Sequence, residues 1–136
     1  YIPDNLYLIG TMNTADRSLA LVDYALRRRF SFISLTPKFN TSKFKKFMQS
    51  KSVDDDLTKK IISKMTSLND IISKDEKNLG IGYQIGHSFF CPTNNDTKYD
   101  DEWYQRVVKY EIRPLLEEYW LDDKERVNQC IKDILS

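Results

Sequence analysis

Cysteine, proline and glycine are scarce in this chain of 136 residues, which contains 2 Cys, 4 Pro and 4 Gly. Cys91 and Cys130 are far apart and lack both a Cys-x-x-Cys motif and a neighbouring histidine pair, which excludes a disulfide scaffold and a tetrahedral zinc site. We therefore expect two buried or half-buried free thiols. Few Pro and Gly, together with 8 Tyr, 7 Phe and 2 Trp, exclude a disordered tail and favour an ordered fold rich in helix.

An excess of charge of one sign is also missing, because 21 Lys and Arg face 20 Asp and Glu. A net charge of +1 provides no global field that attracts DNA, RNA or an anionic membrane, so any nucleic-acid contact has to be local. No apolar run approaches the ~20 residues of a membrane span, and no basic and apolar leader opens the chain. We expect a cytoplasmic protein without a membrane partner.

Residues 5–12 and 30–35 are apolar runs of the kind found in buried parallel strands. Between them, Ser18 is placed to cap a helix that ends at Arg29. A strand, a polar loop, a helix and a second strand form a parallel crossover, in which the loop lies at the carboxyl end of the first strand. Because Tyr1 opens directly onto this pattern, the chain was either processed or cut from a longer one, and we expect the second.

After Pro37 the sequence predicts only helices. A short helix begins at Thr41 or Ser42, and a long one begins at the acidic cluster 54–56 with apolar residues at 57, 61, 65, 68 and 72. Helical spacing returns over 99–119, where Pro114 predicts a kink or a new helix start, and a final helix follows Asp122 or Asp123. Residues 78–88 predict a glycine-rich loop or short strand. The expected domains are 1–37, which is α/β, and 38–136, which is helical.

Polar residues gather where the first predicted strand ends, in the sequence Asn13-Thr-Ala-Asp-Arg-Ser18. The neutral amide of Asn13 can position a water beside a triphosphate, or it can simply satisfy loop backbone. Asp16 belongs to the same polar cluster, and it can simply be a turn or cap residue that bonds to the Ser18 backbone. The chain has no GxxxxGK[ST] phosphate-binding loop and no Ser-His-Asp arrangement, so no known motif completes an active site here.

Two further positions carry alternatives. Arg29 ends the run Arg27-Arg28-Arg29 and either stays solvated or offers its guanidinium across a subunit boundary to a γ-phosphate. His87 is the single histidine, and it is either structural or brought close to a ligand by its glycine neighbour. The aromatic residues between 99 and 120 are expected to form a core seam rather than to stack on bases.

The run Leu6-Tyr-Leu-Ile-Gly-Thr-Met-Asn-Thr-Ala-Asp-Arg-Ser18, followed by Leu26-Arg-Arg-Arg-Phe30, closely resembles the second half of the AAA+ module in the McrB family. That family comprises the nucleotide-hydrolysing motor subunits of 5-methylcytosine-specific restriction systems. Ile85-Gly-His-Ser-Phe-Phe90 and residues 110–120 resemble its lid. The resemblance implies a fold of the α/β plus all-α class, a partial AAA+ module in which the last strands of a parallel P-loop NTPase sheet precede a helical lid subdomain.

The resemblance also implies catalytic roles in residues 1–37. Asn13 would be the sensor 1 residue that orients the attacking water, and Asp16 would be the acid that helps to position it. Arg29 would be the arginine finger that acts in trans on a neighbouring subunit. These three residues are the expected catalytic set.

Nucleotide contacts are implied for Arg28, His87 and Ser88. Arg28 lies beside the finger and is a candidate for a second interface or nucleotide contact. His87 and Ser88 fall where the sensor 2 region of the lid approaches the nucleotide, although neither is the arginine usual at that position. No metal ligand is expected in this chain.

The cofactor that the resemblance implies is GTP, or alternatively ATP, with Mg²⁺. The Walker A loop and Walker B acids that hold them are absent here, and we expect them upstream of Tyr1. The implied partners are other copies in a ring, an McrC-like nuclease subunit and DNA bound through other domains. Alone, the chain is expected not to hydrolyse nucleotide. The alternatives are a non-enzymatic helical adapter domain and, less supported, direct nucleic-acid binding through Arg27–Arg29.

Overall fold

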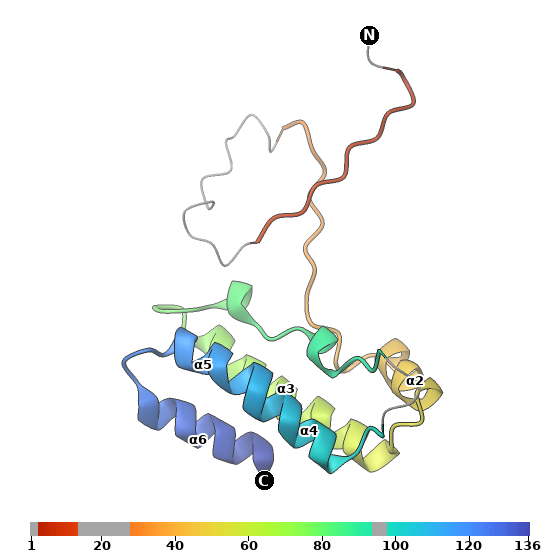
Figure 1. Cartoon of the computed structure of the whole chain (residues 1–136). Helices are drawn as coiled ribbons and strands as arrows, with labels where there is room; N and C mark the ends of the chain where they lie inside the picture. Colours follow the sequence, from red (N-terminus) through yellow and green to blue (C-terminus); the bar gives the residue numbers. More distant parts are fainter. Residues whose placement is uncertain (1–2, 14–27, 94–97) are drawn as a thin grey trace. The chain divides into compact units, whose positions relative to one another are not determined.

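The computed structural model describes residues 3–13, 28–93 and 98–136. Two compact units divide the chain, residues 1–34 and residues 35–136. Figure 1 traces both, and each is described here by itself. The second unit contains every helix that the described residues form.

The predicted parallel sheet is wrong for the described part of the first unit. Neither 5–12 nor 30–35 forms a strand, and the apolar residues that should be buried are open to solvent: Leu8 is 72% exposed, Ile9 95% and Ile33 85%. Strand backbone needs hydrogen-bonding neighbours, and the described residues offer neither run such a neighbour. The strand prediction was wrong because it relied on the apolar composition of these two runs alone. The helix predicted up to Arg29, with its Ser18 cap, falls mostly on residues 14–27, outside the described ranges.

The second unit opens with two helices whose starts the sequence predicted correctly. Helix α2 (Ser42–Ser50) is capped by Thr41, whose hydroxyl oxygen accepts a hydrogen bond from the Phe44 N–H over 3.2 Å. Helix α3 (Asp55–Lys74) is capped by Asp54, whose carboxylate accepts the N–H groups of the first turn. The predicted apolar stripe of α3 is buried at every position: Leu57, Ile61, Met65, Leu68 and Ile72.

The glycine-rich stretch contains two short 3-10 helices, η2 (Ile81–Tyr83) and η3 (His87–Phe90). Gly80, immediately before η2, has a φ of 94°, a conformation that favours glycine. The predicted loop is therefore confirmed, and it leads from the end of α3 to the start of the next long helical segment.

That segment consists of α4 (Asp101–Val107), the π turn η4 (Val108–Ile112) and α5 (Arg113–Tyr119). The N–H of Arg113 donates to the carbonyl of Val108, five residues earlier. Pro114 follows and has no N–H to donate, so the wider turn lies where α-helical bonding is interrupted. A new helix begins beside Pro114, which is one of the two predicted alternatives. Helix α6 (Lys124–Leu135) is capped by Asp123 and ends the unit.

Helix α3 packs against α2, η2 and α6, while α6 also packs against α5 and η4 (Figure 1). The largest fully buried side chains are Tyr104, Phe90 and Met48. Each such side chain stabilises the fold by ~1.5–3 kcal/mol. The aromatic seam is largely confirmed, with Tyr110, 65% exposed, as an exception. Cys130 is buried and Cys91 half-buried, and both are free thiols as predicted. No described helix has the length and apolarity to cross a membrane.

Candidate functional site

The predicted site residues fall in both units. Asn13, Arg28 and Arg29 belong to residues 1–34 and are exposed, with both arginines in a turn. Asp16 lies outside the described residues. An exposed amide and two guanidinium groups are hydrogen-bond donors suited to phosphate oxygens and water. The structure describes these donors within the first unit alone. Their contact with a nucleotide therefore stays a prediction.

His87 and Ser88 lie in the second unit, at the start of η3. The Nδ1 atom of His87 accepts a hydrogen bond from the backbone N–H of Lys38 over 3.2 Å. The imidazole meets Phe39 and Phe44 edge-on, with ring centroids 6.2 and 6.0 Å away. Since Nδ1 is an acceptor, the neutral ring carries its proton on Nε2, which is the nitrogen left for a ligand. His87 thus has the structural role that is one of its two alternatives, and its contact with a nucleotide stays a prediction.

Ser88 lines a surface hollow of about 310 Å³ beside η3. Aromatic and polar side chains share this lining, among them Phe89, Trp103 and Glu111. Cys91 also lines it, and burial raises the pKa of its thiol. A raised pKa leaves less of the thiol as thiolate, so burial makes Cys91 a weaker nucleophile than an exposed cysteine.

Asn69 on α3 holds the loop that presents His87. Its Nδ2 group donates to the Ile85 carbonyl over 2.9 Å, while its Oδ1 accepts the Ile85 N–H over 2.6 Å. Asn69 is only 5% exposed, so this paired contact is shielded from water. Asn69 is not among the residues that the sequence predicted to be important. The available signal was an amide four residues after Met65, on the face of α3 that otherwise carries apolar residues.

A second polar cluster joins the end of α3 to α5 and α6. The Asp75 carboxylate accepts hydrogen bonds from Trp120 Nε1 and Arg126 NH1, each over 2.8 Å, and from Asn78 Nδ2 over 3.1 Å. The guanidinium of Arg126 also lies over the Trp120 ring, 4.5 Å from its centroid. The Trp120 hydrogen bond, followed by Asn78 and Arg126, lowers the pKa of Asp75. No local sequence signal marks this cluster, because its members are distant along the chain.

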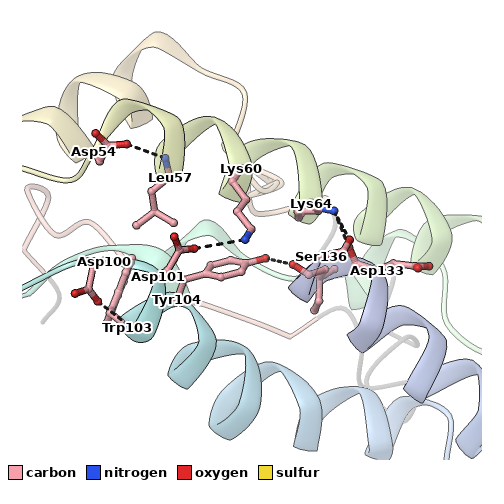
Figure 2. Close-up of polar contacts among 11 residues, drawn as sticks. Asp54, Leu57, Lys60, Lys64, Asp100, Asp101, Trp103, Tyr104, Asp133 and Ser136 are labelled. Atoms are coloured by element: carbon pink, nitrogen blue, oxygen red, sulfur yellow. Dashed lines mark hydrogen bonds and ion pairs between the residues drawn. The ribbon is translucent and has the colours of Figure 1, made fainter.

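A third set of contacts joins α3 to α4 and α6 (Figure 2). Lys60 of α3 pairs with Asp101 of α4 at 3.4 Å, and Lys64 donates to the Asp133 carbonyl of α6 at 2.8 Å. The hydroxyl of Tyr104 donates to the Ile134 carbonyl over 2.6 Å. Burial raises the pKa of Tyr104 and keeps it a neutral donor. These contacts hold α3, α4 and α6 together.

A metal centre is not found in the part of the chain that the structure describes. No group of three or more His, Cys, Asp or Glu side chains there is placed to hold a metal ion.

Comparison with known proteins adds two similarities. Residues 60–128 match a family model described as McrB, alpha-helical lid domain. The chain is also 51% identical over 136 residues to the Type IV methyl-directed restriction enzyme EcoKMcrB subunit of Escherichia coli (strain K12). That alignment covers 99% of this chain and 30% of the relative. The similarity therefore extends over both units but over less than a third of the relative's length.

Proposed function

Because the chain belongs to the McrB family, we propose that it forms the water-positioning, finger and lid parts of a nucleotide-hydrolysing motor subunit in a DNA restriction system. The observation that carries this proposal is an alignment with 51% identity that covers 99% of the chain and so spans both units. The family model over 60–128 supports residues 38–136 as the lid. Coverage of the first unit by this alignment favours a motor over a helical adapter, since an adapter needs only the second unit.

The proposed reaction is hydrolysis of GTP, or of ATP, by transfer of the γ-phosphoryl group to water. Asn13 would orient the attacking water through its amide, and Asp16 would help to hold that water in line. Arg29 would approach the γ-phosphate of the neighbouring subunit and neutralise the charge that builds up during transfer. Arg28 would make a second contact at the same boundary.

The exposed donors of the first unit fit a triphosphate, since guanidinium groups bind phosphate oxygens with directed hydrogen bonds. They do not fit Mg²⁺, and the described residues offer no site for it. We therefore assign metal and phosphate binding to groups other than those described. When bound, Mg²⁺ supplies neutralisation of phosphate charge.

His87 and Ser88 would place the lid against the nucleotide. The hydrogen bonds of Asn69 and Lys38 support this role, because they fix Ile85 and His87 immediately before Ser88. A finger used in trans requires a ring of copies. An McrC-like nuclease subunit would be its partner, and DNA would be bound through other domains.

A mixing experiment tests the proposal in a full-length protein that carries this chain. Arg29→Ala should lower the hydrolysis rate ~10³-fold or more, and Asn13→Ala should also lower it strongly. Mixing the two inactive variants should restore part of the activity, because an intact Asn13 then meets an intact Arg29 on its neighbour. Arg106→Ala, which removes another exposed arginine, is the matched control and should leave the rate unchanged.

Two results would contradict the proposal. Unchanged hydrolysis by Arg29→Ala would remove the finger assignment. Failure of the mixed variants to regain activity, while each still assembles with wild-type subunits, would show that Arg29 does not act in trans.

A further inference from the structure

Residues 36–53 concentrate positive charge in a way that the balanced total conceals. This stretch contains five lysines and no aspartate or glutamate, whereas residues 54–136 contain 17 acidic and 12 basic residues. Helix α2 occupies the middle of the stretch. A net charge near zero therefore results from segregated regions of opposite sign, and it does not exclude a local polyanion site.

Helix α2 directs most of these lysines outward. Phe44 and Met48 are 4% and 0% exposed and define the inward face. With about 100° between successive residues, Lys46 falls opposite this inward face, while Lys43 and Lys45 fall on its two flanks. All three side chains are exposed, as is Lys38 just before the helix. We call these four residues the lysine face.

The four ammonium groups of the lysine face make no ion pair within the described residues. Elsewhere in the unit lysines do pair: Lys59 with Asp56 at 2.8 Å and Lys98 with Asp100 at 2.9 Å. The lysine face thus differs from the rest of the unit in two ways: it is positively charged, and its ammonium groups have no ion-pair partner among the described residues.

The positive charges of the lysine face also destabilise helix α2. The first turn of α2 has no acidic residue, and Lys43 lies there, near the positive end of the helix dipole. Lys43 and Lys46 are three residues apart on one surface, a spacing at which like charges repel. Helix formation alone does not account for this pattern. A bound polyanion would neutralise the repulsion.

We propose that the lysine face binds the phosphate backbone of double-stranded DNA without reading its sequence. Ammonium groups on long stems bind phosphates as point charges and need no shaped pocket. A protein partner would instead require a desolvated centre of aromatic, Met or Arg anchors, and interfaces of that kind are depleted in lysine. The choice of DNA as the polyanion rests on the proposed role in a restriction system, whereas the charge argument stands apart from it.

Anisotropy of a labelled DNA duplex, titrated with the chain in the absence of nucleotide, tests the proposal. Binding should weaken as salt is raised from about 50 to 200 mM, with a log–log slope of about −3 to −4 for four phosphate contacts. The variant Lys43→Gln, Lys45→Gln, Lys46→Gln should lose most of the affinity and reduce that slope by about 3. Its circular dichroism should match the parent, because glutamine is a good helix former.

Lys74→Gln, Lys77→Gln, Lys132→Gln removes the same charge from exposed positions elsewhere and is the matched control. It should bind DNA nearly as the parent does. Equal loss in both triple variants would overturn the lysine face as the site, and so would absence of binding at low salt. Tighter binding of poly-L-glutamate than of DNA would assign the face to an acidic protein instead. Since no nucleotide is present, none of these outcomes depends on the Arg29 experiment.

Discussion

The indole N–H of Trp120 donates a hydrogen bond to Oδ2 of Asp75 over 2.8 Å, although 45 residues separate the two in the chain. The same oxygen accepts from Arg126. Three helices, α3, α5 and α6, therefore meet at one carboxylate whose side chain is 8% exposed. Hydrogen bonds to a shielded charge are stronger than those between neutral groups. The Asp75 cluster is therefore a main polar contribution to the packing of α3, α5 and α6.

Trp120→Phe should lower the free energy of unfolding by about 1.5–3 kcal/mol, since it removes a donor to a charged acceptor. Chemical denaturation of the chain measures this loss. Trp103→Phe makes the same change in ring size at a half-buried indole outside this cluster. An equal loss in the two variants would show that ring volume, rather than the bond to Asp75, is responsible.

Stability should depend on pH through Asp75. Because the pKa of this carboxyl is lowered in the folded chain, its contribution is complete above the ordinary carboxyl pKa of about 3.9 and is lost as pH falls through the lower folded value. Asp75→Asn should therefore be less stable than the parent at neutral pH, and the difference should shrink in acid. Asp122→Asn, at an exposed position, should show a constant difference instead.

Asn69→Ala should destabilise the chain by about 2–4 kcal/mol, because it leaves the buried N–H and C=O of Ile85 without partners. Hydrogen exchange should quicken over residues 80–88, the loop that carries His87 and Ser88. Asn40→Ala, an exposed change of the same kind, should stay within about 0.5 kcal/mol of the parent. Unchanged exchange in the loop would argue against Asn69 as its clamp.

Thr58→Val should raise the free energy of unfolding by about 1 kcal/mol. The Thr58 hydroxyl is buried, and it has no hydrogen-bond partner in the described ranges 3–13, 28–93 and 98–136. Valine keeps the shape and has a similar helix propensity. Thermal denaturation should show the increase, while Thr66→Val on the exposed side of α3 should not. A decrease for Thr58→Val would mean that the hydroxyl does have a partner in solution.

His87→Ala should quicken hydrogen exchange at the Lys38 amide about tenfold, as expected for the loss of a hydrogen bond worth ~1.4 kcal/mol. His87→Asn should keep much of the protection, because its amide oxygen can replace Nδ1 as the acceptor. Nuclear magnetic resonance of the amide resolves the two cases. Equal exchange in both variants and the parent would show that the His87 contact does not hold Lys38.

Local patterns predicted the helical unit well. Thr41, Asp54 and Asp123 satisfy the N–H groups of their own first turns, so their capping roles depend only on neighbours a few residues away. The stripe of α3 is readable for the same reason, since its period follows from helix geometry. Pro114 marks a helix start because its missing N–H acts on the adjacent turn.

The predicted sheet failed because strand formation depends on distant partners. Leu8 and Ile9 belong to a run whose apolarity is typical of a buried strand, yet both are exposed. An apolar run specifies a preference for burial and cannot specify what covers it.

The sequence by itself determined the starts of α2, α3 and α6, the free thiols and the resemblance that led to Asn13, Asp16 and Arg29, because each of these can be read from residue types and their spacing along the chain. Only the tertiary structure decided that Asn69 clamps Ile85 and that Trp120 and Arg126 share Asp75. It also showed that the lysines of α2 face outward without carboxylate partners among the described residues. Such relations join segments that are remote in sequence, and they exist only after packing has brought those segments within hydrogen-bond distance or kept them apart.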